Sequence, residues 1–569
     1  MKKTIKILKP DPETVHRISR NHGISGISAA ILANRGITCE DDVSAFLNPD
    51  LATLKPPFGI LDLDVAAARI YSAILGKERI LIFGDYDADG VTATTILYEI
   101  LSELGADIRF YIPHRVNEGY GLSPDHITRF AQQHGVNLIV TVDCGSGSRQ
   151  AIRLSKEAGI DVVVTDHHEV ECQLPEAVAF VNPKRPECSS GFDALAGVGV
   201  AFYLMVSLRK IMQADGFFKN RPVINLKKYL DLVAIGTMAD VVPLRDFNRV
   251  FVKTGVDLIK TGDRPGISAL LDVSKIRKEH VTSDDIAFRI APRLNAAGRM
   301  EHANISVDLL LSRQVEEARQ LAFALNRLNT NRQENEKEIF ETIVSHIDRN
   351  RALLKRKTIV LSNPNWHEGI LGIIAARLVE SFYRPVILFA VKGGMGKGSA
   401  RSIRGFDLFN GLSKCASHLS SFGGHAMAAG LSIKMENMGR FSDEFEAYAQ
   451  DSMENADFVP EFNIDYELDF REVNSDLLDE LDLLMPFGSH NEEPLFMTRD
   501  VKVDYQALVG GRHLRMRLVQ QNSGPNIYAI RFNVDPDAPR PDYFERIIYR
   551  LRRNRYSGQN SAQIVIEDV

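Results

Sequence analysis

The sequence predicts an α/β protein in which a parallel-sheet domain is joined by a long helix to a smaller α/β domain and then to a C-terminal β-barrel. Between Ile80 and about residue 240, apolar strand-like runs alternate with helical patterns, which indicates βαβ units and a largely parallel sheet. A helical pattern without Gly or Pro runs from about Val315 to Ile347, and short β-like segments follow residue 500. With 569 residues the chain is too long for one hydrophobic core, so several domains are expected.

We divide the chain in order along the sequence. The first part is a helical cap with turns, in which ISAAILANRGI forms a short helix that ends near Gly36. The long helix is polar in its second half, so we interpret it as a connector between domains. Residues 457–482 carry ten acidic side chains and one arginine. The predicted parts are the N-terminal helical cap (1–60), the parallel-sheet domain (61–310), the connector helix (311–350), the second α/β domain (351–455) and the barrel with its acidic lead-in (456–569).

The composition is that of a globular protein, with 44% hydrophobic and 25% charged residues. We expect a cytoplasmic location, because no stretch approaches the ~20 apolar residues of a membrane span and the first residues lack the apolar core of a signal peptide. The five cysteines are scattered without a CxxC pair, which argues against a disulfide framework and a structural zinc site. The net charge of −6 does not exclude a nucleic-acid substrate, because the distribution of charge decides.

Acidic residues follow three apolar strand-like runs and one further apolar stretch. Ligands bind beyond the carboxyl ends of parallel strands, so these side chains should converge on one cleft. Burying like charges together costs several kcal/mol or forces protonation, and a pair of divalent cations would compensate. The segments are ILIFG before Asp85, Asp87 and Asp89; LIVTV before Asp143; DVVVT before Asp166, His167 and His168; and LVAIGTMA before Asp240.

The segment DYDADG (85–90) allows two conformations and one alternative metal. Its three aspartates point the same way if the strand continues, and loop geometry must bring them together if the chain turns at Gly84 or Gly90. A calcium loop of the DxDxDG type would need a Glu at position 12, where this chain has Leu97, and a helix in front instead of a strand. Imidazole with carboxylate suits Mn²⁺, and carboxylate with water suits Mg²⁺. We expect Asp166 to orient a ligating imidazole without binding metal itself.

These motifs, in this order, resemble those of the DHH phosphoesterase superfamily, and GGHAMAAG resembles the signature of its associated DHHA1 domain. Within the superfamily, the segments Pro113–Ser123, Pro292–Met300 and Leu325–Gln333 are similar to the RecJ exonuclease family. The resemblance covers essentially the whole chain. It implies that residues 61–310 form a DHH domain, residues 351–455 a DHHA1 domain, and the C-terminal barrel an oligonucleotide-binding (OB) fold.

The resemblance also implies roles for single residues. Asp85 and Asp87 would bind one metal ion, Mn²⁺ or Mg²⁺, and Asp143 would bridge it to a second. His168 would contact the scissile phosphate, and Arg115, after the third candidate strand, would lie at the mouth of the cleft. Two such ions can generate the attacking hydroxide and neutralise the charge that develops during in-line attack. The implied metal ligands are Asp85, Asp87, Asp89, Asp143, His167 and Asp240.

Glycine-rich and basic segments are candidates for phosphate binding. Residues 392–404 hold four cations, four glycines and no acid, which favours an anion site for a terminal 5′ phosphate. A solvated hairpin turn is the alternative. Residues 285–300 read as a loop-like segment with three arginines, and Asn326, Arg327 and Arg332 could make DNA or interdomain contacts. The predicted phosphate contacts are Ser399, Arg401, Gly424, His425 and Arg299.

The barrel contains a basic run, because residues 546–555 hold five arginines and no acid. Arginines beside tyrosines suit a sequence-tolerant single-strand groove, so we expect Arg550, Arg552 and Arg553 to contact DNA. A solvated barrel edge is the alternative. The acidic residues 457–482 either screen this run or form a linker.

The resemblance implies a 5′→3′ exonuclease that degrades single-stranded DNA to mononucleotides in recombination and repair. It suggests a monomer, with a RecQ-type helicase and a single-strand-binding protein as partners. A hydrolase of short oligonucleotides or small phosphoesters is a second hypothesis, although such enzymes are typically much shorter. A catalytically silent replication scaffold is a third, although a scaffold would be expected to have lost metal ligands that are intact here.

Overall fold

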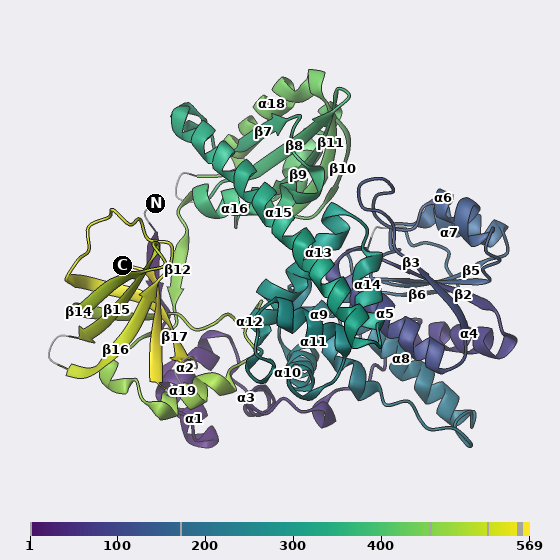
Figure 1. Ribbon diagram of the computed structural model, residues 1–569, viewed down its shortest axis with the longest axis horizontal. Coiled ribbons are helices and arrows are strands. Elements are labelled where there is room, and N and C mark those ends of the chain that lie inside the picture. Colours follow the sequence, from purple (N-terminus) through teal and green to yellow (C-terminus); the bar gives the residue numbers. More distant parts are fainter. Residues whose placement is uncertain (1–2, 171–172, 455–457, 521–522, 555–560) are drawn as a thin grey trace.

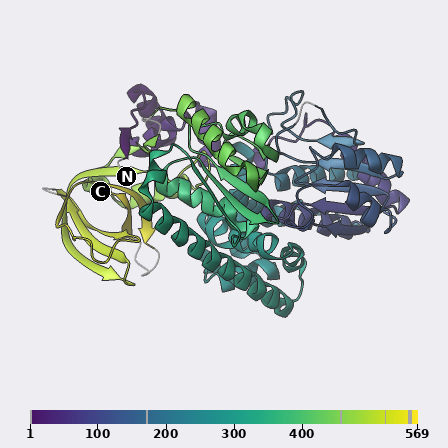
Figure 2. The same ribbon diagram turned by 90° about the horizontal axis from the view of Figure 1, so that it is seen from above.

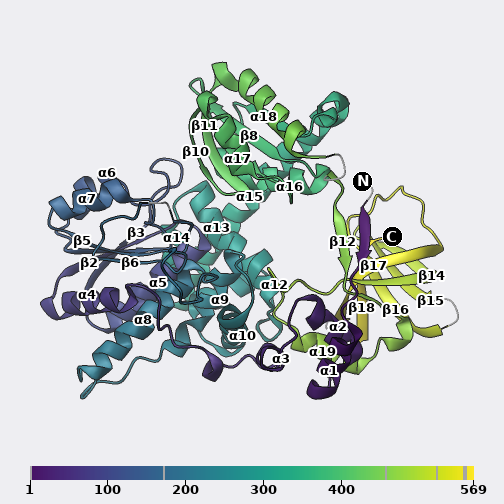
Figure 3. The same cartoon turned by 180° about the vertical axis from the view of Figure 1, so that it is seen from behind.

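The structure is a computed structural model that describes residues 3–170, 173–454, 458–520, 523–554 and 561–569. The parallel-sheet domain lies at one end of the molecule and the barrel at the other, and the second α/β domain lies on one side between them (Figures 1 and 3). The view from above shows the long connector helix running past both α/β domains (Figure 2). The fold class predicted from the sequence is confirmed.

The first domain is built on a five-stranded, all-parallel sheet of order β3-β2-β4-β5-β6. The central strands are buried on both faces, which is why they read as continuous apolar runs. In β2, Ile80 and Ile82 pack on one face, whereas Leu81 and Phe83 pack on the other. The strands are β2 Arg79–Gly84, β3 Asp107–Tyr111, β4 Leu138–Val142, β5 Asp161–Thr165 and β6 Ala179–Val181. The covering helices include α4 Leu63–Gly76, α5 Ala88–Glu103, α7 Arg149–Glu157, α8 Gly197–Ala214, α9 Leu230–Ala239, α10 Asp246–Thr261 and α11 Pro265–Val273.

Residues 285–300 are helical, so the prediction of a loop-like segment is wrong. A single π-helical turn, Ile286–Ile290, leads into α13 Ala291–Met300, and α14 Asn304–Leu311 follows. Pro292 directly follows the π-helical turn, whose altered hydrogen-bond pattern accommodates a residue without a backbone N–H. The small residues that weaken the helical pattern in the sequence, such as Ala296 and Ala297, are fully buried, so packing stabilises this helix.

The connector is α15 Val315–Arg349, a single helix of 35 residues. Its first half buries Leu325 in the core of the first domain, and its second half buries Ile343 in the core of the second. The second domain has a mixed sheet of order β10-β11-β9-β8-β7. Its elements are β7 Ile359–Asn363, α16 Leu371–Phe382, β8 Val386–Lys392, β9 Met395–Arg401, α17 Leu408–Lys414, β10 Leu419–Gly424, β11 Ala428–Lys434 and α18 Met438–Ser452.

The C-terminal strands form a barrel that closes through the pairing of β14 with β17. The acidic residues that precede it are folded: they contain β12 Glu461–Ile464, β13 Tyr466–Glu467 and α19 Ser475–Leu483. The barrel strands are β14 Phe496–Val509, β15 His513–Gln520, β16 Ser523–Arg531, β17 Tyr543–Asn554 and β18 Ser561–Asp568.

The N-terminal residues are helical as expected, but they pack against the barrel. The helices are α1 Pro12–His22, α2 Gly26–Asn34 and α3 Glu40–Leu47. Ile18 and Ile31 share one apolar core with barrel residues such as Phe496. A strand that the sequence did not suggest, β1 Thr4–Ile7, pairs in parallel with β12.

Arg249 of α10 ties this combined module to the first domain. The side chain is 1% exposed, and its guanidinium carbon lies 3.7 Å from the ring centroid of Phe46. Burial lowers the pKa of Arg249 to about 9. Its N–H groups donate to the backbone carbonyls of Phe46, Leu483, Leu484, Met485 and Pro486.

Two further expectations concern the membrane and the thiols. Within the residues that the structure describes, no helix has the combination of length and apolar character that crossing a membrane demands. Four cysteines, Cys39, Cys144, Cys188 and Cys415, are free thiols, and Cys172 lies outside the described residues.

Candidate metal centre

The DYDADG motif is split between a strand and a helix. Strand β2 ends at Gly84, and Asp87 caps α5 by accepting hydrogen bonds from the backbone N–H of Asp89 (2.9 Å) and Gly90 (3.1 Å). The extended register therefore stops, and the turn brings the three aspartates together. A Cβ at Gly90 would lie 2.6 Å from the carbonyl oxygen of Asp85, so this turn requires glycine.

Helix α8 helps to hold the acidic cluster. The backbone N–H groups of Gly197 and Val198 at its N-terminus donate to the two carboxylate oxygens of Asp89 at 2.6 and 2.9 Å. Asp143 follows β4 with a backbone φ of 55° and is fully buried beside them. A Cβ at Gly197 would lie 2.5 Å from its Oδ1, so the glycine makes room for this carboxylate.

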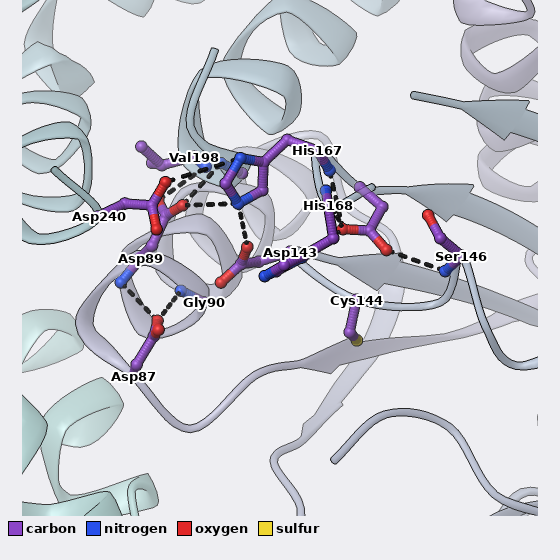
Figure 4. A network of polar contacts seen from close by, with 12 residues as sticks. Asp87, Asp89, Gly90, Asp143, Cys144, Ser146, His167, His168, Val198 and Asp240 are labelled. Atoms are coloured by element: carbon purple, nitrogen blue, oxygen red, sulfur yellow. Dashed lines mark hydrogen bonds and ion pairs between the residues drawn. The ribbon is translucent and has the colours of Figure 1, made fainter. Parts of the chain in front are cut away.

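His167 lies at the centre of the cluster (Figure 4). Its Nε2 is 3.1 Å from Asp143 Oδ1 and 3.8 Å from Asp89 Oδ2, and its Nδ1 is 3.6 Å from Asp240 Oδ2. Asp240 directly follows the C-terminus of α9. Three overlapping groups of residues could each hold a metal ion, because the ligand atoms within each group lie within 4.8 Å of one another. The groups are Asp85 with Asp87 and Asp143; Asp89 with His167 and Asp240; and Asp143 with His167 and His168.

The cluster concentrates negative charge in a desolvated place. Burial, followed by the charge of Asp87, raises the pKa of Asp85 well above its ordinary value and that of Asp89 to about 7. Burial, followed by the charge of Asp89, raises the pKa of Asp143 and Asp240 well above the ordinary value. These shifts follow from like charges in a desolvated place.

His167 is neutral, because burial followed by the charge of His168 lowers its pKa to about 3. Both of its ring nitrogens, together with Asp85 Oδ1 and Asp143 Oδ1, are buried without a hydrogen-bond partner among the described residues. Carboxylates with a neutral imidazole fit a divalent cation such as Mn²⁺ or Mg²⁺, which would satisfy these atoms.

Asp166 fixes the imidazole of His168, which belongs to one of the three groups that could hold a metal ion. Its Oδ1 lies 2.8 Å from His168 Nδ1, and its Oδ2 accepts a hydrogen bond from the Ser146 N–H at 2.9 Å. Burial lowers the pKa of His168, but the hydrogen bond and charge of Asp166 outweigh it and raise that pKa to about 9. Sequence reasoning missed Tyr120, whose hydroxyl lies 3.1 Å from His168 Nδ1. Its place in the segment Pro113–Ser123 was the available signal.

The predicted phosphate contacts come from both α/β domains. Arg401 and Ser399 lie on β9 against Gly372 of α16, where a Cβ would be 2.9 Å from Arg401 Nη2 and 3.0 Å from Ser399 Oγ. Arg299 of α13 donates to the carbonyl of Gly369 at 3.1 Å. Burial, followed by the charges of Arg115 and other arginines including Arg401, lowers the pKa of Arg299 to about 9. These arginines therefore lie close together.

Arg115 and the DHHA1-like segment GGHAMAAG (423–430) lie near the predicted phosphate contact Arg401. The Arg115 guanidinium lies 4.8 Å from the ring centroid of Tyr86, and its charge is felt at Asp85. Gly424 ends β10, and the N–H of His425 donates to the Ala428 carbonyl at 2.9 Å. Burial, followed by the charges of groups that include Arg401 and His168, lowers the pKa of His425.

Comparisons with known proteins cover nearly the whole chain. Three family models match: "DHH family, N-terminal domain" over residues 79–237, "DHHA1 domain" over 355–451 and "RecJ OB domain" over 464–568. The chain is 37% identical to the single-stranded-DNA-specific exonuclease RecJ of Escherichia coli, over 95% of each chain. The chain belongs to the RecJ family.

Two crystal structures of RecJ from Thermus thermophilus are similar over 99% of this chain. The complex with Mn²⁺ has a TM-score of 0.83 at 30% identity and is covered over 79% of its length. The complex with Mg²⁺ has a TM-score of 0.75 at 29% identity and is covered over 78%. The metals in these RecJ structures are those that the donor set of the present cluster fits.

The basic run of the RecJ-type barrel is ion-paired. Arg550 lies 2.9 Å from Glu567, Arg552 lies 2.5 Å from Glu493, and Arg553 lies 3.1 Å from Asp482. Arg552 also reaches Asp284 of the first domain, and Arg553 reaches Asp479. Asp479 and Asp482 of the acidic segment therefore screen part of this run. Arg555 and Tyr556 lie outside the described residues, and the DNA contacts of this run stay a prediction.

Proposed function

We propose that this chain is a metal-dependent exonuclease that degrades single-stranded DNA from the 5′ end to mononucleotides, in recombination and repair in the cytoplasm. The observation that carries the proposal is that five carboxylates and one neutral histidine lie in overlapping ligand groups that share Asp143 or His167. The printed name of the Escherichia coli relative, a single-stranded-DNA-specific exonuclease, supports the substrate class.

Two divalent ions, Mn²⁺ or Mg²⁺, would bind here in our proposal. Asp85 and Asp87 would hold one ion, Asp89, His167 and Asp240 would hold the other, and Asp143 would belong to both sets of ligands. When bound, such ions supply Lewis-acid charge that activates water and offsets charge on the phosphate. The overlap of the three ligand groups at Asp143 and His167 supports this assignment.

The protein's own groups position the substrate and stabilise charge. With a pKa raised to about 9, His168 is protonated at neutral pH and can donate to a non-bridging oxygen of the scissile phosphate. Asp166 and the Tyr120 hydroxyl fix the orientation of this ring. Arg115, at the same edge of the cleft, adds positive charge as the pentacovalent phosphate forms.

The terminal 5′ phosphate is bound, in our proposal, by Ser399, Arg401 and Arg299 together with Gly424 and His425. A strand anchored there by its end presents one phosphodiester to the metal centre at a time, so each cut releases a mononucleotide. Arg401→Ala should raise KM on 5′-phosphorylated ends. An unchanged preference for those ends would contradict these contacts.

The decisive experiment uses 5′-labelled single-stranded DNA with Mn²⁺, with and without a chelator. We expect labelled mononucleotide that disappears with the chelator and with Asp143→Ala. Intact DNA under all conditions would instead favour the silent scaffold. RNA and dinucleotides, tested alongside, separate the exonuclease from a hydrolase of short oligonucleotides. Sedimentation tests the expected monomer, and pull-down with a RecQ-type helicase or a single-strand-binding protein tests the expected partners.

A further inference from the structure

One helix of the first domain contacts both the metal-binding motif and the second domain. Helix α13 lies between the two α/β domains (Figures 1 and 3) and packs against α5, α9 and α15. Helix α5 carries Asp89, and α9 ends directly before Asp240. Met300, the last residue of α13, packs against the apolar cores of both domains. Helix α13 therefore connects the elements that carry metal ligands to the second domain.

On the side of the metal centre, α13 contacts the backbone of the DYDADG motif. The Oδ1 of Asn295 accepts a hydrogen bond from the N–H of Ala88 at 2.7 Å. Gly298 is buried, and a Cβ there would overlap the backbone carbonyl oxygen of Tyr86. Both contacted residues lie between the aspartates of the motif. These two contacts therefore fix the position of α13 relative to the proposed ligands.

On the other side, α13 contacts the segment that begins α16 in the second domain. The Nη1 of Arg299 donates to the carbonyl of Gly369 at 3.1 Å. The backbone carbonyl of Arg299 lies so close to Gly369 that a Cβ at the glycine would overlap it. Gly372 of α16 in turn lies against the side chains of Arg401 and Ser399. This contact therefore leads directly to the proposed phosphate contacts.

The connector helix holds α16 at a further point. Glu336 of α15 is 7% exposed, and its Oε1 accepts a hydrogen bond from Arg377 of α16 at 2.9 Å. Its Oε2 accepts one from Arg332 of α15 at 3.3 Å. The Arg377 guanidinium also lies 4.1 Å from the ring centroid of Phe340. The orientation of the second domain is therefore fixed at two separate places.

The contacts at both ends of α13 bring backbone against backbone without an intervening side chain. A long side chain absorbs a small shift by changing its rotamer, whereas close-packed backbone transmits the shift. A misplacement of about 1 Å between reacting groups can cost about 100-fold in rate. The spacing across α13 therefore bears on the alignment of a strand whose end is bound on one side and whose scissile bond lies on the other.

We propose that α13 is a spacer that fixes the distance between the 5′-phosphate contacts and the metal centre, with Asn295, Gly298 and Gly369 as positioning residues. The inference rests on the proposed function, because the anchored 5′ phosphate and the metal centre are the two ends of the spacer. The spacing brings a single phosphodiester of an anchored strand to the metal centre. A strand with a 5′-hydroxyl end is not held by the phosphate contacts, so the spacing does not govern its alignment.

The first readout compares two kinds of strand end. Gly298→Ala and Gly369→Ala each insert a methyl group at one end of the spacer. On 5′-phosphorylated single-stranded DNA, kcat should fall by about 10- to 100-fold, because the anchored phosphodiester is misaligned. KM should stay within about twofold of the wild-type value, because the phosphate contacts remain. On the same strand with a 5′-hydroxyl end, kcat should also stay within about twofold. A merely destabilised protein would lose activity equally on both ends.

The second readout does not depend on hydrolysis. Bound Mn²⁺ accelerates the nuclear relaxation of phosphorus in thymidine 5′-monophosphate, and this effect weakens steeply with the distance between the two. We expect a smaller acceleration in Gly298→Ala than in the wild type, with unchanged affinity for the nucleotide, because the added Cβ pushes the motif away from α13. Asn295→Ala removes only the hydrogen bond to Ala88 and provides the same two tests if a glycine variant fails to fold.

Gly439→Ala is the matched control. Gly439 is an exposed residue of α18, and among the described residues no atom lies within 4 Å of a Cβ placed there. This variant should match the wild type in both readouts. Equal losses of kcat on the two kinds of end, or wild-type behaviour of all three spacer variants, would overturn the spacer alone. A wild type in which Mn²⁺ leaves the relaxation of the nucleotide unchanged would refute the proposed function together with the spacer.

Discussion

The metal centre and the β17 arginines are both concentrations of one charge in the sequence, but the fold treats them differently. Among the described residues, no Lys or Arg forms an ion pair with Asp85, Asp143 or Asp240. Each of Arg550, Arg552 and Arg553 instead lies against at least one carboxylate. A charge that the fold leaves unpaired in a desolvated place indicates a missing ligand, whereas a paired charge is already satisfied. The following predictions test that difference.

The largest effect is expected at the bridging carboxylate. Asp143→Ala should lower the rate of DNA hydrolysis by about 1000-fold or more, because it removes a ligand from both proposed ions. Initial rates on labelled single-stranded DNA measure the loss. Asp161→Asn is the control. Asp161 is the first residue of β5, at the amino ends of the strands and opposite the metal centre, where it pairs with Arg69. Retained activity in Asp143→Ala would remove the unpaired cluster from the mechanism.

Arg249 is a third case in this comparison. It is a buried cation whose hydrogen-bond acceptors are backbone carbonyls and not a carboxylate. Arg249→Met should lower the free energy of unfolding by about 3 kcal/mol, because several buried carbonyls lose their donors. Urea denaturation measures the change. Arg245→Met, at the exposed residue that directly precedes the same helix, should change it by less than about 0.5 kcal/mol. Equal stability of the two variants would show that the carbonyls find other donors.

The unpaired acids also predict how the stability of the metal-free protein depends on pH. Asp89 has its pKa raised from 3.8 to about 7, so the folded state binds more protons than the unfolded chain. Its contribution to stability is therefore fully present below about pH 4 and is lost as the pH rises through about 7. Asp85, Asp143 and Asp240 shift in the same direction.

Thermal melts in a chelator between pH 5 and pH 8 measure this loss. The melting temperature should fall as the pH rises, and Mn²⁺ should restore it, because a metal binds the charged form of the cluster. Asp89→Asn should flatten the dependence. A melting temperature of the chelated protein that rises with pH would contradict the cluster's electrostatics.

The smallest effect is expected at the β17 arginines. Arg552→Gln removes a cation that already has Glu493 at 2.5 Å, and a phosphate would first have to displace that carboxylate. Binding of single-stranded DNA should weaken by less than about threefold. Fluorescence anisotropy measures this beside Arg401→Ala, for which the effect should be greater. A tenfold loss in Arg552→Gln would show that paired arginines still bind the strand.

The sequence predicted the sheet because strands buried on both faces read as continuous apolar runs. It predicted the cluster because residues that follow the carboxyl ends of parallel strands meet at one end of the sheet. It could not say which of the two histidines Asp166 contacts, because the side chains of adjacent residues point in different directions. The backbone conformation after β5 decides which imidazole lies beside the Asp166 carboxylate. Tyr120 was missed for a related reason, since its contact to His168 spans 48 positions.

Other features that the sequence did not show depend on partners that are distant along the chain. The small residues of α13 are helical because of burial, which composition does not show. The carboxylates that neutralise Arg550 and Arg552 include Glu567, Glu493 and Asp284, none of which belongs to the basic run.

The pairing of β1 with β12 means that the N-terminal segment completes its fold only after the C-terminal segment has been synthesised. A polypeptide leaves the ribosome from its N-terminus, so residues 4–47 are complete long before residues 461–568. Until the later segment appears, Ile18 and Ile31 have no barrel to cover them. The N-terminal helices therefore expose apolar side chains through most of translation. A truncation of the barrel would leave these side chains uncovered and would destabilise the N-terminal segment as well as the C-terminal one.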